Sequence, residues 1–337
     1  MTHTKQGKQS FRFQDSPVIT AWASVAGKKE AEGPLGHSFD ITSQDAYFGQ
    51  RSWELGEKQM QHLALEKLLE KAGIEKEQLD VIFSGDLLNQ CIGSSFTLRN
   101  TGIPHIGLYG ACSTMAESLM LSAMTVGGGF FEHAVAMTSS HFAGSERQYR
   151  FPLGYGGQRT PTAQWTVTGA GAVLVSSQGK GPKIESCTVG TVLDLGSKDA
   201  NNMGAAMAPA ALATIRAHFS DLNAKAEDFD RIITGDLGQL GKEALLALAR
   251  KEGISLGGRL DDCGTMIFDR QTQDVHSGGS GCGCSAVTLC GSLLEDIRKG
   301  KLKKILFCGT GALLSPTSTQ QGLPIPGVCH AICITGG

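Results

Sequence analysis

The residue with the most chemical potential is Cys112, which lies in a turn of small residues before a helical pattern carrying Met115, Leu119 and Ala123. Such a turn places the sulfur beside free backbone N–H groups at a helix N-terminus, where the helix dipole favours thiolate over thiol. A thiolate is a strong nucleophile, but cysteine is also commonly a small buried hydrophobic residue. The local sequence leaves both interpretations of Cys112 open.

Charge and composition exclude several classes of partner. The formal net charge of −2 gives no basic surface for nucleic acid. The polar residues 1–10 contain no signal core, and the longest apolar stretch, 119–137, is broken by three glycines and two charged or titratable side chains, so we expect a soluble protein without a membrane span. The ten cysteines are expected to be reduced thiols. Cys282 and Cys284 lack a second ligand pair, so we expect neither metal nor cofactor.

The elements that must position Cys112 occur twice along the chain. Residues 79–87 reappear as 229–237, and Cys112-Ser113-Thr114-Met115 is matched by Cys263-Gly264-Thr265-Met266. Helical patterns at 53–72 and 116–126 correspond to 205–219 and 285–298, and strand patterns at 133–139 correspond to 304–309. We therefore expect an α/β fold of two duplicated halves, 1–182 and 183–337, that form one compact two-lobed unit.

This duplicated pattern resembles the thiolase superfamily, which includes the ketoacyl synthases. The resemblance covers essentially the whole chain and is carried by four motifs: Gly110-Ala111-Cys112-Ser113, the strand 168–175, the turn 276–281 and the turn 308–312. It implies a five-layered α-β-α-β-α body. Carried over residue by residue, it implies that Cys112 is the nucleophile, His276 its activating base and Cys308 a second acid or base, a trio suited to Claisen chemistry.

One segment departs from the superfamily pattern. Ketoacyl synthases place a His-x-x-Asn pair, and thiolases an Asn-containing turn, after the first strand of the second half, where this chain reads Thr234-Gly235-Asp236-Leu237-Gly238-Gln239. One oxyanion-hole donor stabilises a transition state by about 3 kcal/mol. Asp236 adds a negative charge instead, so we expect acyl-transfer activity to be weak or absent.

Within the superfamily the chain resembles the stage V sporulation protein AD family. The residues that carry this likeness are 52–54, 109–117, 149–156, 158–169 and 322–327. The resemblance implies binding of dipicolinic acid (pyridine-2,6-dicarboxylate), which calcium accompanies, and its uptake into the developing spore. It also implies other stage V sporulation A membrane proteins as partners, a peripheral position on the spore inner membrane, and a homodimer.

A flat dicarboxylate requires cationic groups or N–H donors across a narrow slot, and arginine suits carboxylates best. We predict ligand contacts from the cysteine turn, from the arginines of 139–166 and from the second-half histidine: Cys112, Ser113, Arg147, Arg150, Arg159 and His276. Two alternatives remain: a working thioester-dependent acyltransferase that uses Cys112, and a structural adaptor with a vestigial pocket.

Overall fold

The computed structural model describes residues 3–149 and 158–337. In the first half, the long helix α2 (Trp53–Ala72) begins where Ser52 accepts a hydrogen bond from the backbone N–H of Leu55 and ends at Gly73, whose φ is 65°. The other elements are β3 (Val18–Ala26), α1 (Lys28–Ala31), β4 (Ile41–Thr42), β5 (Val81–Gly85), α3 (Ile92–Leu98), β6 (His105–Leu108), α4 (Thr114–Gly127), β7 (His133–Ser140), α5 (Phe142–Tyr149), β8 (Trp165–Thr166) and β9 (Gly169–Ser176).

The second half repeats this succession. It consists of β10 (Lys183–Thr188), α6 (Met203–Leu222), β11 (Arg231–Thr234), α7 (Gly238–Lys251), β12 (Leu260–Asp262), α8 (Cys263–Met266), β13 (Gly279–Ser280), α9 (Cys282–Thr288), α10 (Leu294–Arg298), β14 (Lys304–Ala312), α11 (Pro316–Gln320) and β15 (Gly327–Thr335). A π-helical stretch, Leu289–Leu293, joins α9 to α10. The sequence did not predict the N-terminal hairpin of β1 (His3–Gln6) and β2 (Ser10–Phe13), which pairs with β10.

The described strands follow one path in the order β12-β11-β14-β15-β10-β3-β9-β7-β5-β6. Each side of this path has the same directions: β7, β5 and β6 run parallel, as do β14, β11 and β12, while β9 and β15 run antiparallel to their neighbours. The two sides meet where Lys183 of β10 pairs with Val18 of β3. The duplication seen in the sequence therefore has a topological counterpart.

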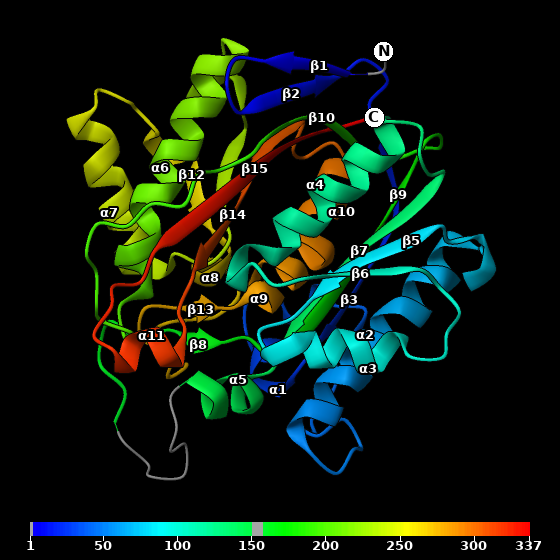
Figure 1. Ribbon diagram of the computed structural model, residues 1–337, viewed down its shortest axis with the longest axis horizontal. Coiled ribbons are helices and arrows are strands. Elements are labelled where there is room, and N and C mark those ends of the chain that lie inside the picture. The colour runs from blue at the N-terminus through cyan, green and yellow to red at the C-terminus, as the bar shows by residue number, and fades with distance from the viewer. Residues whose placement is uncertain (1–2, 150–157) are drawn as a thin grey trace.

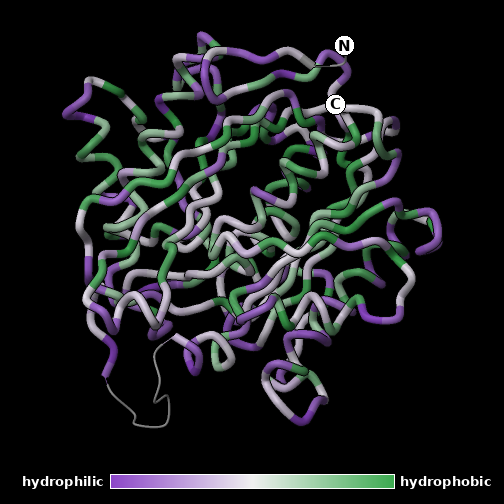
Figure 2. The backbone as a smooth tube through the Cα atoms, in the orientation of Figure 1, coloured by the Kyte–Doolittle hydropathy of each residue, from purple (hydrophilic) through white to green (hydrophobic). Residues whose placement is uncertain are grey.

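Helices lie on both outer faces and between the two sets of strands (Figure 1). Helix α2 packs on β3 and β9, helices α6 and α7 pack against each other, and α6 covers β14 and β15. The central layer holds α4, α9 and α10, whose apolar side chains share one core with residues of both sets of strands, among them Val81, Val173 and Phe307. Hydrophobic residues accordingly follow the inner strands and the central helices (Figure 2).

Candidate functional site

The cysteine turn enters α4 through a strained backbone. Ala111 has a φ of 53°, a left-handed conformation that is unfavourable for a residue with a Cβ. The Ser113 hydroxyl donates to the Gly110 carbonyl at 2.7 Å and lies 2.6 Å from Glu117 Oε1, so its hydrogen bonds close the turn. Strain held by such hydrogen bonds fixes the Cys112 backbone at the helix N-terminus.

Cys112 borders a small cavity between the two halves. Its volume is about 50 Å³, and it is lined by Leu87, Ala111, Cys112, Ser145, Glu146, Tyr149, Thr166, Met203, Ser280, Ala312 and Leu314. Tyr149 encloses one side because its hydroxyl donates to the Leu87 carbonyl at 2.5 Å. The Ser145 hydroxyl is buried and has no hydrogen-bond partner within residues 3–149 and 158–337. Small-molecule sites usually measure about 300–1,000 Å³, so this cavity has room for a group rather than for a whole ligand.

The Cys112 thiol faces the buried carboxyl group of Asp236. The thiol hydrogen-bonds to Asp236, whose Oδ1 also accepts from Thr310 Oγ1 at 2.9 Å, while Oδ2 accepts from the Gly281 N–H at 2.9 Å and from Ser280 Oγ at 3.1 Å. Burial raises the pKa of Asp236 even though these hydrogen bonds favour its charged form. The residue that departs from the superfamily pattern therefore lies directly beside the cysteine.

This arrangement opposes a thiolate. Burial first, and then the negative charge of Asp236 and its hydrogen bond, raise the pKa of the Cys112 thiol well above its ordinary value. The Gly281 N–H and the Ser280 hydroxyl also reach the sulfur and favour its anion, but the opposing effects are larger. Burial and the neighbouring carboxyl group therefore favour the thiol of Cys112 over the thiolate that the helix dipole alone would favour.

The structure does not bring His276 and Cys308 to Cys112. His276 Nε2 lies 3.3 Å from Asp274 Oδ1. Cys308 is fully buried in the core beneath α6, where its thiol donates to the Leu306 carbonyl at 3.8 Å and lies beside Cys329. Neither residue lines the Cys112 cavity. The three groups that the superfamily resemblance joins in one catalytic trio thus have separate neighbours.

The predicted arginines also separate. Arg147 pairs with Glu54 and lies over the Trp53 ring with its guanidinium carbon 5.2 Å from the ring centroid. Arg159 pairs with Asp274 at 3.0 Å, close to His276. Arg150 lies outside the described residues. Among the described lining residues of the Cys112 cavity there is no arginine or lysine, and Glu146 brings a carboxyl group instead.

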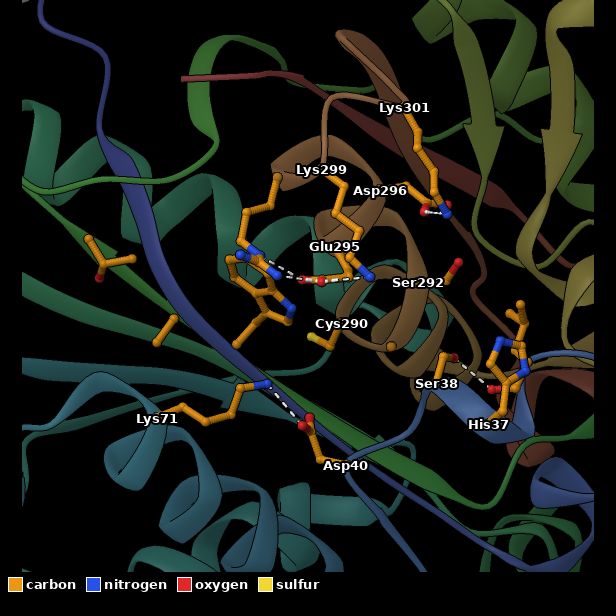
Figure 3. A pocket seen from close by; sticks show the side chains of 16 residues that line it. His37, Ser38, Asp40, Lys71, Cys290, Ser292, Glu295, Asp296, Lys299 and Lys301 are labelled. Carbon is orange, nitrogen blue, oxygen red and sulfur yellow. Dashed lines mark hydrogen bonds and ion pairs between the residues drawn. The ribbon is translucent and has the colours of Figure 1, made fainter.

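A larger hollow of about 760 Å³ lies elsewhere, between β3, the end of α2 and the π-helical stretch with α10 (Figure 3). Its lysines are paired within the wall: Lys71 with Asp40 at 2.9 Å, Lys299 with Glu295 at 3.0 Å, and Lys301 with Asp296 at 2.9 Å. These internal ion pairs compensate its positive charge, so the hollow has no clear preference for an anion.

Sequence reasoning missed several residues of the site. Tyr149, Ser280 and Ala312 line the cavity, although each lies in a segment that carried the family likeness. Their presence in motifs 149–156, 276–281 and 308–312 was the available signal. The pairing of Trp165–Thr166 with Gly279–Ser280 brings the segment 158–169 to the turn 276–281.

Comparison with known proteins identifies the family. The family model for stage V sporulation protein AD matches residues 7–335. Stage V sporulation protein AD of Bacillus subtilis (strain 168) is 43% identical over 326 residues, covering 97% of this chain and 96% of that protein. The chain belongs to the stage V sporulation protein AD family.

Solved structures show the same fold at low sequence identity. The 3-oxoacyl-[acyl-carrier-protein] synthase III of Aquifex aeolicus VF5 aligns with a TM-score of 0.58 at 13% identity, covering 95% of this chain and 99% of that chain. A variant of OleA from Xanthomonas campestris gives a TM-score of 0.60 at 15% identity, covering 95% and 98%. The family member described here therefore has the thiolase-like fold that its sequence predicted. None of its described helices is long and apolar enough to cross a bilayer.

Proposed function

We propose that this protein binds dipicolinic acid and supports its uptake into the developing spore as part of a membrane complex. The family name of its relative connects it to sporulation. The observation that carries a binding role rather than an acyl-transfer role is the placement of the buried Asp236 carboxyl group, held by Thr310, Ser280 and Gly281, beside the Cys112 thiol. A scaffold that resembles acyl-transfer enzymes here keeps its cysteine as a thiol.

Acyl transfer by this superfamily needs an attacking thiolate and donors for the developing oxyanion. A carboxyl group hydrogen-bonded to the thiol meets neither need, because it opposes ionisation of the sulfur and repels an oxyanion. Such a site retains the shape of the fold while losing its nucleophile. This supports binding without covalent chemistry.

The size of the cavity restricts how the ligand lies. About 50 Å³ beside Cys112 corresponds to one or two water molecules of roughly 30 Å³ each. A whole dipicolinate molecule does not fit in this volume, so in this proposal the ligand binds mainly outside the cavity. Calcium then accompanies the ligand, bound to its carboxylates rather than to a protein site.

The proposal also includes the protein's assemblies. Strand β6 is the edge of the path, and Ile106 on it and Tyr109 next to it are 48% and 52% exposed. An exposed edge strand with apolar side chains is suited to pairing with another strand, which supports a homodimer through β6. The membrane partners are other stage V sporulation A proteins, which hold the chain on the spore inner membrane.

Titration calorimetry with the full-length protein tests the binding role. Dipicolinate is expected to bind in the micromolar range, and benzene-1,3-dicarboxylate, which keeps both carboxylates but lacks the ring nitrogen, is the matched control. Failure of dipicolinate to bind at millimolar concentration contradicts the proposal.

Thioester-dependent acyl transfer is the second candidate. It is favoured by the Gly281 N–H and the Ser280 hydroxyl, two donors that face the Cys112 sulfur. Incubation with acyl-CoA followed by intact-mass measurement tests it. A stable acyl adduct that disappears in Cys112→Ala establishes this activity, and no adduct is expected under the binding proposal.

A further inference from the structure

A group of cationic side chains surrounds Asp274, at a distance from the Cys112 cavity. Arg159 Nη2 donates to the Asp274 carbonyl at 2.8 Å and lies 3.0 Å from its Oδ1. Lys29 Nζ donates to the same carbonyl at 3.1 Å, and His276 Nε2 lies 3.3 Å from Oδ1. Arg270 is nearby, because its Nε donates to the His276 carbonyl at 3.1 Å.

An aromatic surface supports two of these cations. Trp165 stacks on Phe142 with ring centroids 3.7 Å apart, Lys29 Nζ lies 3.8 Å from the Trp165 ring centroid, and the Arg159 guanidinium carbon lies 4.9 Å from it. Cations over an indole ring are attracted to its π-electrons and are held in place. Lys29 and Arg159 are therefore ordered rather than free in solvent.

This cationic cluster, made of Lys29, Arg159, Arg270 and His276, is separate from the Cys112 cavity. Trp165 and Thr166 are successive residues of β8, and side chains alternate between the two faces of a strand. Thr166 lines the cavity, so Trp165 and the cations above it belong to the other face of the ribbon formed by β8 and β13.

Three side chains of this cluster, Lys29, Arg159 and Arg270, are cationic, against the carboxylates of Asp274 and of Glu32, which acts on Lys29. The Asp274 carboxylate is the acid that Arg159 and His276 contact, and neighbouring Glu30 is buried, with its pKa raised to about 7 by loss of solvation. Arg159 Nη1 is buried and has no hydrogen-bond partner among the residues that the structure describes. The cluster thus retains donor capacity that the described residues leave unused.

The Asp274 side chain is 75% exposed, and among the described residues its carboxylate contacts Arg159 and His276. Exposed ion pairs of this kind contribute little to stability, so this carboxylate can be displaced at low cost. We infer that the cationic cluster is a carboxylate-binding site in which Asp274 occupies the position of the ligand, and that an incoming carboxylate replaces it between Arg159 and His276.

The ligand class is a planar dicarboxylate, an identity that rests on the proposed function. One carboxylate takes the place of Asp274, with the planar guanidinium of Arg159 as its donor. The second carboxylate lies within the surplus positive charge of Lys29 and Arg270. Asp274 then competes with the ligand, so removing its carboxylate strengthens binding. Removing a side chain that contacts the ligand would instead weaken binding.

Two substitutions with opposite expected effects test the site, using dipicolinate and the full-length protein in titration calorimetry. Asp274→Asn removes the competing charge at nearly constant shape and is expected to lower the Kd about fivefold or more. Arg159→Lys retains charge but loses the planar fork and is expected to raise the Kd about tenfold. Arg216→Gln, which changes an arginine paired with Glu252 elsewhere, is the matched control and leaves the Kd unchanged.

Failure of this inference differs from failure of the proposed function. Leu314→Trp fills the Cys112 cavity and serves as the third variant. If dipicolinate binds the wild type, Asp274→Asn and Arg159→Lys with the same Kd but does not bind Leu314→Trp, the inferred carboxylate site is wrong and the proposed function stands. If neither the wild type nor Asp274→Asn binds dipicolinate, both are wrong. Circular dichroism confirms that each exposed-site variant is folded.

Discussion

The Gly-Asp-Leu turn occurs once in each half, and its two aspartates have different partners. Asp86, after β5, accepts hydrogen bonds from the Leu88 N–H at 3.0 Å and from the N–H and hydroxyl of Ser94 at 2.9 and 2.8 Å. Asp236, after β11, instead accepts from Thr310, Ser280 and Gly281 and contacts the Cys112 thiol. The first aspartate stabilises its own turn, whereas the second joins distant segments at the cavity.

The reason for the difference is a third aspartate. In the second half, Asp262 accepts from the N–H groups of Leu237 and Gly238 at 2.8 and 3.0 Å. Asp262 thereby satisfies the turn that Asp86 satisfies in the first half, and Asp236 is released toward Cys112. A repeated motif thus keeps its backbone while a neighbouring residue decides what its side chain does.

The largest expected effect concerns Asp262. Burial raises its pKa to about 7, whereas an unfolded aspartate titrates near 3.9. Between about pH 4 and pH 7 the native state keeps a proton on Asp262 that the unfolded state has lost. The contribution of Asp262 to the free energy of unfolding therefore falls by about 1.4 kcal/mol for each pH unit in this range. Asp262→Asn should remove this fall, and urea unfolding at pH 4.5–7.5 measures it.

Asp230→Asn is the matched control. The N–H groups of Lys304 and Lys303 lower the pKa of Asp230, so its contribution has the opposite sign and is lost only as the pH falls below about 4. An identical pH slope in the wild type and Asp262→Asn contradicts the idea that Asp262 is buried and protonated.

The second prediction separates the two turns by stability. Asp86→Ala leaves the buried N–H groups of Leu88 and Ser94 without an acceptor, and each such loss costs about 1–3 kcal/mol. We expect the free energy of unfolding to fall by about 3 kcal/mol, while alkylation of Cys112 in the native state keeps its wild-type rate. A large change in that rate means that Asp86, too, controls the cysteine.

Much of the fold was predictable, because it depends on local periodicity and on repetition. The pattern at 53–72 became α2 with the same bounds, and the echo of 79–87 in 229–237 gave β5 and β11. The site was less predictable. Asp236 and Cys112 are far apart in sequence, and so are Arg147 and Glu54, and no local pattern reveals which acid pairs with which thiol or guanidinium. The direction of the Cys112 pKa shift depended first on the burial of the thiol and then on that tertiary contact, neither of which a local pattern reveals.

The third prediction changes the contact that distinguishes the turns. Asp236→Asn removes the negative charge beside Cys112 while keeping a side chain that can hydrogen-bond to Thr310 and Ser280. We expect the pKa of the Cys112 thiol to fall by about one unit, which increases the thiolate fraction about tenfold. Alkylation of Cys112 by iodoacetamide at pH 8 should therefore accelerate about tenfold. Peptide mass spectrometry locates the label, and Asp86→Asn is the matched control with no acceleration.

The smallest expected effect compares the two cysteine turns. Cys112 borders a cavity, whereas its counterpart Cys263 is fully buried in packed core at the start of α8. Removing a buried group costs more where the surroundings are closely packed. Cys112→Ala should therefore lower the free energy of unfolding by about 1 kcal/mol or less, and Cys263→Ala by more, as measured by urea unfolding at pH 7. Equal losses would mean that Cys112 is a core residue like its repeat, and that the cavity beside it contributes nothing specific to this half of the fold.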